Sequence, residues 1–263
     1  MPTLPLNSSV ELNYQCSGDD PVAIVLCNGA GVPLTYWGSF AVRLSEVARV
    51  IQFDQRNAGA TQYEGKFTLG DIAADIIGLL DHLKVDRVIV MGHAWGGRVA
   101  QVFARDYPNR VNGLIVCGTG GQFPAVDMHD SLQELGNARR RNDFETWQTH
   151  LEALFCANGA STRVPDQFIE LTEAMWNSPP SRKARWDGNA FPSKSYWGLC
   201  EAATLLIYGE EDKNGTPENA NDLHQRIASS RLVMLEQAGH FVVHEQEDRV
   251  LQEIKTFLGM LQQ

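Results

Sequence analysis

The sequence predicts an α/β protein whose mostly parallel sheet is covered by helices on both faces. Short apolar runs rich in β-branched residues alternate with longer segments of helical periodicity, which is the pattern of repeated β-α-β units. Most of these runs are apolar at every position, as strands buried on both faces must be. With 263 residues, 43% of them hydrophobic and 21% charged, the chain is not a disordered tail, a fibre or a coiled coil.

The expected elements follow one another regularly along most of the chain. The predicted strands are Val22–Cys27, Val50–Phe53, Arg87–Met91, Leu114–Cys117, Thr204–Tyr208 and Leu232–Leu235, with Val10–Tyr14 added as an antiparallel edge strand. Apolar residues at helical spacing predict helices over Leu69–Leu83, Arg98–Tyr107, Pro217–Ile227 and Glu247–Leu261. Thr68 and Asp71 form a capping box at the start of the first of these helices, and Pro108 ends the second.

This rhythm changes between about Gln122 and Cys200. Strand-like runs are absent there, and helical segments are expected at Ser131–Arg140, Phe144–Phe155 and Asp166–Trp176. We therefore predict a helical cap, residues 122–200, inserted into a core made of residues 1–121 and 201–263. Four of the six tryptophans fall in this segment, where they either form an aromatic wall over a pocket or pack the small cap itself: Trp147, Trp176, Trp186 and Trp197.

The most informative stretch runs from Val88 to Arg98. An apolar strand ends in Gly92-His93-Ala94-Trp95-Gly96, and a helix follows at once. A side chain at the top of such a sharp turn needs a strained backbone and nearly side-chain-free positions two residues before and after it, which Gly92 and Gly96 supply. The stretch resembles the nucleophile elbow Gly-x-Ser-x-Gly of the α/β-hydrolase fold superfamily, with Ala94 at the nucleophile position. His93 is expected to support the turn.

That resemblance implies an acid and a histidine later in the chain, and both motifs are present. The strand with Gly209-Glu210-Glu211-Asp212 is similar to the family's strand followed by Gly-x-x-Asp, and Gly239-His240 is similar to its histidine turn. The resemblance implies that His240 acts as general base and then general acid, and that Asp212 orients it and stabilises the imidazolium. Glu210 and Glu211 are rivals for the acid role, and only the family spacing selects Asp212.

The resemblance also implies an oxyanion hole and a substrate class. The expected backbone donors are the amides of Trp95, at the start of a helix, and of Ala30, in the loop Asn28-Gly29-Ala30-Gly31. That loop and Asp54-Gln55-Arg56-Asn57-Ala58-Gly59 are similar to the 3-oxoadipate enol-lactonase-like branch, and the likeness covers roughly residues 10–121 and 201–261. It implies a carboxylesterase or lactonase, and the aromatic residues expected at the pocket imply a small apolar or aromatic substrate. The expected pocket residues are Asn28, Gly29, Phe123, Trp147, Trp176 and Trp197.

Ala94 leaves three hypotheses open, because a methyl group cannot attack an acyl carbon. In the first, alanine replaces the serine of a hydrolase that acts on an ester, lactone or activated C–C bond, so that this chain is inactive. In the second, the protein naturally lacks a nucleophile and either binds a ligand or uses His240 as a base in lyase or oxygenase chemistry. In the third, alanine replaces the aspartate of an epoxide hydrolase or dehalogenase, in keeping with Trp95. Tyr196 is the one tyrosine between residues 122 and 200, whereas epoxide hydrolases of this fold use a pair.

Composition and motifs argue against other classes of function. There are 22 Lys+Arg against 32 Asp+Glu and no basic run, so neither nucleic acid nor an anionic membrane is an expected partner. The cysteines are far apart and predict neither a disulfide framework nor a zinc site: Cys16, Cys27, Cys117, Cys156 and Cys200. No phosphate-loop or His-Glu-x-x-His motif occurs, so no cofactor and no metal are expected. The N-terminal residues resemble no targeting signal, which predicts a cytoplasmic protein.

Overall fold

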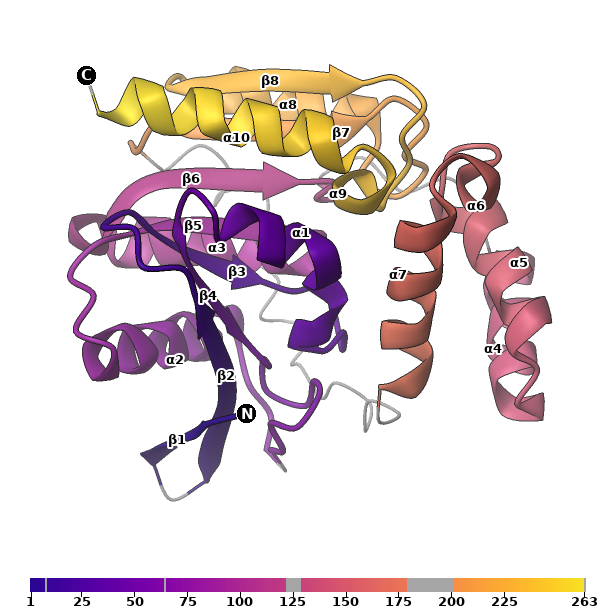
Figure 1. Cartoon of the computed structure of the whole chain (residues 1–263), viewed down its shortest axis with the longest axis horizontal. Coiled ribbons are helices and arrows are strands. Elements are labelled where there is room, and N and C mark those ends of the chain that lie inside the picture. The colour runs from indigo at the N-terminus through magenta and orange to yellow at the C-terminus, as the bar shows by residue number, and fades with distance from the viewer. Residues whose placement is uncertain (8, 64, 122–128, 179–200, 263) are drawn as a thin grey trace.

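An eight-stranded, mostly parallel sheet forms the centre of the molecule (Figure 1). The computed structural model describes the whole chain except residues 8, 64, 122–128, 179–200 and 263. The strands are β1 (Thr3–Asn7), β2 (Val10–Ser17), β3 (Ala23–Cys27), β4 (Arg49–Phe53), β5 (Val88–His93), β6 (Val111–Cys117), β7 (Thr204–Gly209) and β8 (Ser230–Leu235). Their order is β1-β2-β4-β3-β5-β6-β7-β8, and β4, β3 and β5 to β8 run parallel. The predicted fold class is confirmed.

The edge of the sheet differs from the prediction. The expected strand at Val10–Tyr14 is present as β2 and pairs antiparallel with β4, but β1 pairs antiparallel on its outer side and is the edge strand. Residues Thr3–Asn7 alternate between exposed and half-buried positions, so they lack the continuous apolar run that identifies the inner strands. Pro5 is tolerated there because an edge strand does not need every backbone N–H for pairing.

Helices cover both faces of the sheet (Figure 1). The core helices are α1 (Gly38–Leu44), α2 (Leu69–His82), α3 (Trp95–Asp106), α8 (Pro217–Arg226), α9 (Val242–Glu245) and α10 (Glu247–Leu261), with short 3₁₀ turns η1 (Leu34–Trp37) and η2 (Pro108–Arg110). Apolar side chains of α2, α3 and α8 pack on one face, and those of α1 and α10 on the other. Thr68 and Asp71 form the predicted capping box of α2. Within the described ranges, no helix is both long and apolar enough to cross a membrane.

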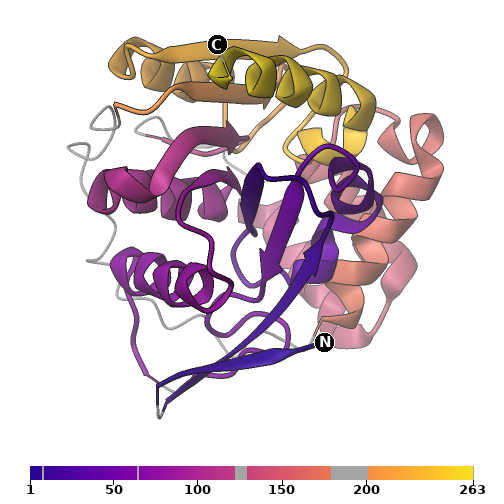
Figure 2. The same ribbon diagram turned by 60° about the vertical axis from the view of Figure 1, so that its left-hand side comes forward.

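The described residues between β6 and β7 include four further helices, which we call the inserted helices. They are α4 (His129–Arg141), α5 (Phe144–Phe155), α6 (Ala160–Arg163) and α7 (Pro165–Asn177). Figures 1 and 2 show them grouped at the end of the sheet toward which the arrows of β6 and β8 point. Ligands of open parallel α/β sheets bind at this carboxyl end of the strands.

Candidate active site

The turn between β5 and α3 carries a strained residue. Ala94 has φ 52° and ψ −115°, a backbone conformation that residues with a Cβ rarely adopt. A Cβ on Gly92 would overlap the backbone of Gly96, and a Cβ on Gly96 would overlap the carbonyl of Cys27. The Ala94 amide donates to the Cys117 carbonyl at 2.9 Å, which fixes the turn to β6. The two glycines therefore let the turn close tightly at the carboxyl ends of the strands.

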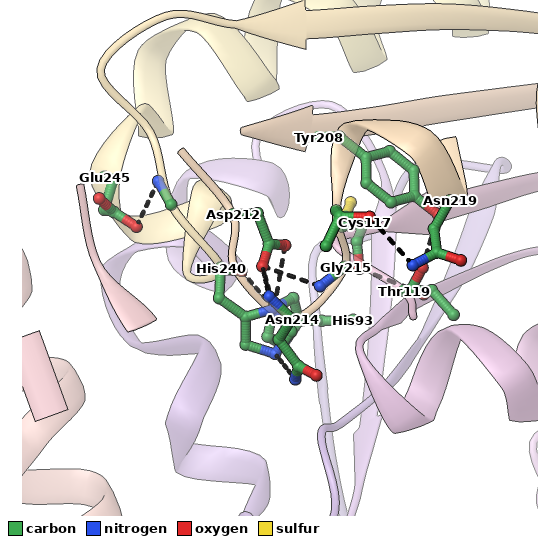
Figure 3. Close-up of polar contacts among 12 residues, drawn as sticks. His93, Cys117, Thr119, Tyr208, Asp212, Asn214, Gly215, Asn219, His240 and Glu245 are labelled. Carbon is green, nitrogen blue, oxygen red and sulfur yellow. Dashed lines mark hydrogen bonds and ion pairs between the residues drawn. The ribbon is translucent and has the colours of Figure 1, made fainter. Parts of the chain in front are cut away.

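A carboxylate and an imidazole meet beside this turn (Figure 3). His240 Nδ1 lies 3.0 Å from Oδ2 of Asp212, and the two residues are buried. Oδ1 of Asp212 accepts from the backbone amides of Asn214 and Gly215, each at 2.8 Å. Burial acts to raise the pKa of Asp212, but His240 and these two amides outweigh it and hold the pKa below its usual value. The carboxylate is thus an anion that accepts the Nδ1 proton of His240.

The structure distinguishes among the three candidate carboxylates. Glu210 is exposed, and Oε2 of Glu211 accepts from the backbone amide of Asn158 at 3.1 Å. Asp212, the residue that the family spacing selects, is the carboxylate that contacts His240. The catalytic roles of both residues stay a prediction.

His93 connects the turn to the histidine loop. Its Nε2 lies 2.7 Å from the His240 carbonyl, which can only accept, so Nε2 carries the proton. Nδ1 is then the acceptor for the hydroxyl of Tyr36 at 3.0 Å. Burial, together with the neighbouring His240, lowers the pKa of His93 to about 3. Neutral His93 is therefore held between Tyr36 and the histidine loop, a position from which it can support the turn.

Asn214 contacts the other ring nitrogen of His240, and nothing in the sequence pattern singled it out. Its side-chain Nδ2 lies 3.3 Å from His240 Nε2. Because Asp212 holds the proton on Nδ1, Nε2 of a neutral His240 carries a lone pair, and the Asn214 amide donates to it. Nε2 is therefore held as a proton acceptor.

These groups open into one cavity of about 600 Å³. Ala94 and His240 both line it, together with Gly29, Ala30 and Trp95 from the predicted oxyanion loop and helix start. Most of the remaining wall is apolar and comes from α4, α5, α7 and the loops near β3 and α9: Val32, Leu135, Trp147, Leu151, Phe155, Met175 and Phe241. The cavity is large enough for a small organic ligand.

Known proteins share this architecture. A family model described as the alpha/beta hydrolase fold matches residues 22–247. The chain belongs to the α/β-hydrolase fold family. It is 28% identical to a 2-hydroxy-6-oxo-2,4-heptadienoate hydrolase of Pseudomonas putida, over 97% of this chain and 95% of that protein.

Solved structures of this hydrolase family agree. A thermophilic esterase from Thermogutta terrifontis superposes with a TM-score of 0.80 and 26% identity, covering 96% of this chain and 94% of the esterase. The enol-lactonase of Burkholderia xenovorans superposes with a TM-score of 0.79 at 22% identity, over 98% of this chain and all of that one (100%), and shares the fold. Both the Pseudomonas putida relative and the esterase are named as hydrolytic enzymes.

The remaining residues predicted to line the pocket have different positions in the structure. Asn28 is buried and builds the loop of this α/β-hydrolase: its Nδ2 donates to the carbonyls of Val32 and Phe53, and its Oδ1 accepts from Trp37. Trp147 lines the cavity, whereas the neighbouring wall position is filled by Met175 rather than by Trp176. Phe123 and Trp197 lie outside the described residues.

Trp176 instead belongs to the packing of the inserted helices. Its ring centroid lies 5.1 Å from that of Phe144 and 5.3 Å from that of Trp147, and the guanidinium of Arg139 lies 4.4 Å from it. Arg139 also donates to the Trp176 carbonyl at 2.6 Å. These residues form an aromatic core between α4, α5 and α7, so Trp147 fits both interpretations of the tryptophans and Trp176 fits only the packing one.

One charged side chain lines the cavity among the described residues. Arg98, on the first turns of α3, reaches the wall and donates to the Gly120 carbonyl at 3.4 Å. Burial lowers the pKa of Arg98, though an arginine remains a cation at neutral pH. The sequence did not indicate that Arg98 faces the cavity, because one charged residue on a helix carries no sign of what it contacts.

Proposed function

We propose that this chain is the scaffold of a hydrolase that opens a small carboxylic ester, a lactone or an activated C–C bond, with residue 94 as the nucleophile position. One observation supports this above all others. Ala94 occupies a strained turn at the wall of the same cavity as His240, whose Nδ1 is bound by the Asp212 carboxylate. Such strain persists where the surroundings enforce it, and in this arrangement it serves to present a side chain at position 94.

With serine at position 94, the reaction proceeds in two halves. His240 Nε2 takes the proton of the serine hydroxyl as its oxygen attacks the acyl carbon, and the resulting imidazolium is stabilised by Asp212. The amides of Ala30 and Trp95 stabilise the negative oxygen of the tetrahedral intermediate. His240 then gives its proton to the leaving group, and a water molecule, activated in the same way, releases the acyl group.

Alanine at position 94 removes this step and leaves the rest of the site in place. Loss of the nucleophile from such a triad costs on the order of 10⁶-fold in rate. We infer that Ala94 stands where the active enzyme has serine, so that this chain binds substrate and turns it over very slowly. The inserted helices then belong to the cap predicted from the sequence and cover the site.

The lining of the cavity supports a substrate with an apolar or aromatic acyl part. Trp147, Leu151 and Phe155 of α5 form one wall, and Phe241 adds another ring. Among the matched proteins, one is named as the hydrolase of an oxo-dienoate and another is an esterase. Attack on a carbonyl carbon opens both esters and activated C–C bonds, and this site is arranged to support such an attack.

A fluorophosphonate probe tests the proposal without knowledge of the substrate. Intact-mass measurement of Ala94→Ser, beside the unsubstituted chain, is expected to show one adduct on the serine variant alone. Adding His240→Ala to that variant removes the general base and is expected to abolish labelling. Absence of an adduct on Ala94→Ser, in a folded protein, contradicts the serine hydrolase.

The contact between Asn214 and His240 favours one second candidate. Nε2 of His240 is held as a proton acceptor at 3.3 Å from the amide, without any help from residue 94. A natural protein lacking a nucleophile could use this nitrogen as a base on a bound substrate or water. In that case the unsubstituted chain turns over its substrate, His240→Gln abolishes turnover, and Ala94→Ser gives no acyl-enzyme.

A further inference from the structure

Two loops that are far apart in the sequence lie against each other at the site. The first, Phe155–Ala157, begins at the last residue of α5, and the second, Gly239–His240, is the histidine loop. The His240 amide donates to the Phe155 carbonyl at 2.6 Å. A Cβ on Gly239 would overlap the backbone of Phe155 to Ala157, so the loops are as close as two backbones can come.

A single buried carboxylate joins these loops a second time. Oε1 of Glu245 accepts from the Gly239 amide at 3.0 Å, and Oε2 accepts from the Ala157 amide at 2.7 Å. The Glu245 side chain is 2% exposed, and Nη2 of Arg163 on α6 lies 4.0 Å from its Oε2. Figure 3 shows Glu245 on the far side of His240 from Asn214. Glu245 is not among the residues that line the cavity.

The geometry calls for a carboxylate at this position. Two N–H donors from different segments point at one side chain, and only a group with two acceptor oxygens satisfies both of them. A glutamine of the same shape would present an N–H₂ to one of the two amides and lose that bond. Burial raises the pKa of Glu245 to about 7 despite the two amides and Arg163, which lower it, with Asp212 adding to the rise. At pH 8 the group is an anion whose two oxygens both accept.

We propose that Glu245 is a positioning residue that clamps the histidine loop to the end of α5. The position of His240 in the site then depends on how the inserted helices pack against the core. The two hydrogen bonds are the evidence that Glu245 holds the loops together. The expected effect on catalysis rests on the hydrolase function proposed above. Releasing the clamp leaves the Asp212 and Asn214 side chains in place but frees the backbone from which the imidazole is presented. Small displacements of a catalytic group are costly, because reactivity depends on its orientation.

The chain offers a matched control two residues further on. Glu247 is also a buried carboxylate at the start of α10, but its oxygens bind Ser39 and Arg43 on the α1 side and do not touch the histidine loop. Glu245→Gln and Glu247→Gln each replace one buried carboxylate with an amide of equal size. Only the first removes a bond between the two loops.

The first measurement uses the unsubstituted chain at pH 8 as its reference and needs no catalysis. Amide hydrogen exchange and the downfield proton resonance of His240 Nδ1 report on the clamp and on the bond to Asp212. In Glu245→Gln we expect about tenfold faster exchange at Ala157, Gly239 and His240, and loss of the Nδ1 resonance. In Glu247→Gln both are unchanged. A Glu245→Gln protein with unchanged exchange and an intact resonance overturns the proposal.

The second measurement uses Ala94→Ser and an ester substrate. Adding Glu245→Gln is expected to lower kcat about 100-fold and leave KM nearly unchanged, because Glu245 lies outside the cavity. Equal losses with Glu245→Gln and Glu247→Gln overturn a specific role for Glu245. If Ala94→Ser shows no activity at all, the hydrolase proposal fails, and the exchange result still decides whether the clamp exists.

A third measurement covers the case in which Glu245→Gln does not fold. If Glu245 holds the two loops together, the amides of Ala157, Gly239 and His240 become exposed in one opening event. Hydrogen exchange of the unsubstituted chain should then give these amides the same opening free energy and the same urea dependence. Independent opening of the two loops contradicts the clamp.

Discussion

Replacing Ala94 with glycine tests whether the turn is strained in the chain as it stands. Ala94 holds φ 52° and ψ −115°, which glycine adopts without the clash of a Cβ. The substitution removes one methyl group, and Ala94 is half-buried at the cavity wall, so little packing is lost. Glycine at position 94 is therefore expected to stabilise the protein, and at the N-cap of α3 it carries no penalty relative to alanine.

The expected size of the effect follows from this geometry. Backbone strain of this kind costs on the order of 1–3 kcal/mol, and the greater freedom of glycine in the unfolded chain offsets about 0.5–1 kcal/mol of the gain. A net stabilisation of about 1 kcal/mol remains. At about 2.1 cal/mol/K per residue, a chain of 263 residues has an unfolding entropy of roughly 0.55 kcal/mol/K, so Tm is expected to rise by about 2 °C.

Urea and thermal unfolding of Ala94→Gly measure this change, with Ala100→Gly as the matched control. Ala100 is fully buried in the interior of α3, where glycine loses helix propensity and a packed methyl group, so a destabilisation of about 2 kcal/mol is expected. If Ala94→Gly destabilises the protein as Ala100→Gly does, position 94 carries no strain. The argument that the turn is built to present a side chain then fails.

Three other predictions concern the same site and its supports. On the Ala94→Ser background, Asp212→Asn is expected to lower kcat by about 10⁴, because the amide leaves His240 in the wrong tautomer; an unchanged kcat would show that another group orients it. Burial lowers the pKa of His93 to about 3, so below pH 6.5 the native state binds fewer protons than the unfolded state. The free energy of unfolding is therefore expected to fall as the pH drops from 6.5 toward 3, by on the order of 5 kcal/mol in all. Urea unfolding between pH 4 and 7.5, over which His93 accounts for roughly 3 kcal/mol of this fall, checks this, and His93→Gln should reduce the slope. Gly96→Ala should destabilise by about 3 kcal/mol or more because its Cβ overlaps a backbone carbonyl, whereas Gly259→Ala, with open space around it on α10, should stabilise by about 0.5–1 kcal/mol in the same assay.

Most of the fold followed from the sequence, since buried strands and amphipathic helices carry their own periodicity. The helix over Glu247–Leu261 was predicted with the bounds that the structure shows, and the capping box at Thr68 marked the start of α2. Strand β1 was missed because an exposed edge strand needs no apolar run, and α1 was missed because it is only seven residues long.

Features that depend on neighbouring residues in the chain could be predicted from the sequence alone. The glycines around Ala94 are a local pattern, because steric limits on a turn act over a few residues. Asp212 and His240 were identified by the short motifs around them and by their order after that turn, which matches the family that the chain resembles. These patterns were sufficient to predict the family and to locate the candidate site.

Which distant groups meet was determined by packing in three dimensions. The fold selected Met175 rather than Trp176 for the cavity wall, assigned Asn28 to the support of its loop, and brought Arg98 and Asn214 to the site. It also joined Glu245 to Ala157, 88 positions away in the chain. Such contacts depend on how α5, α9 and the sheet pack against one another, and a hydrogen bond between distant segments leaves no periodic signal in either of them.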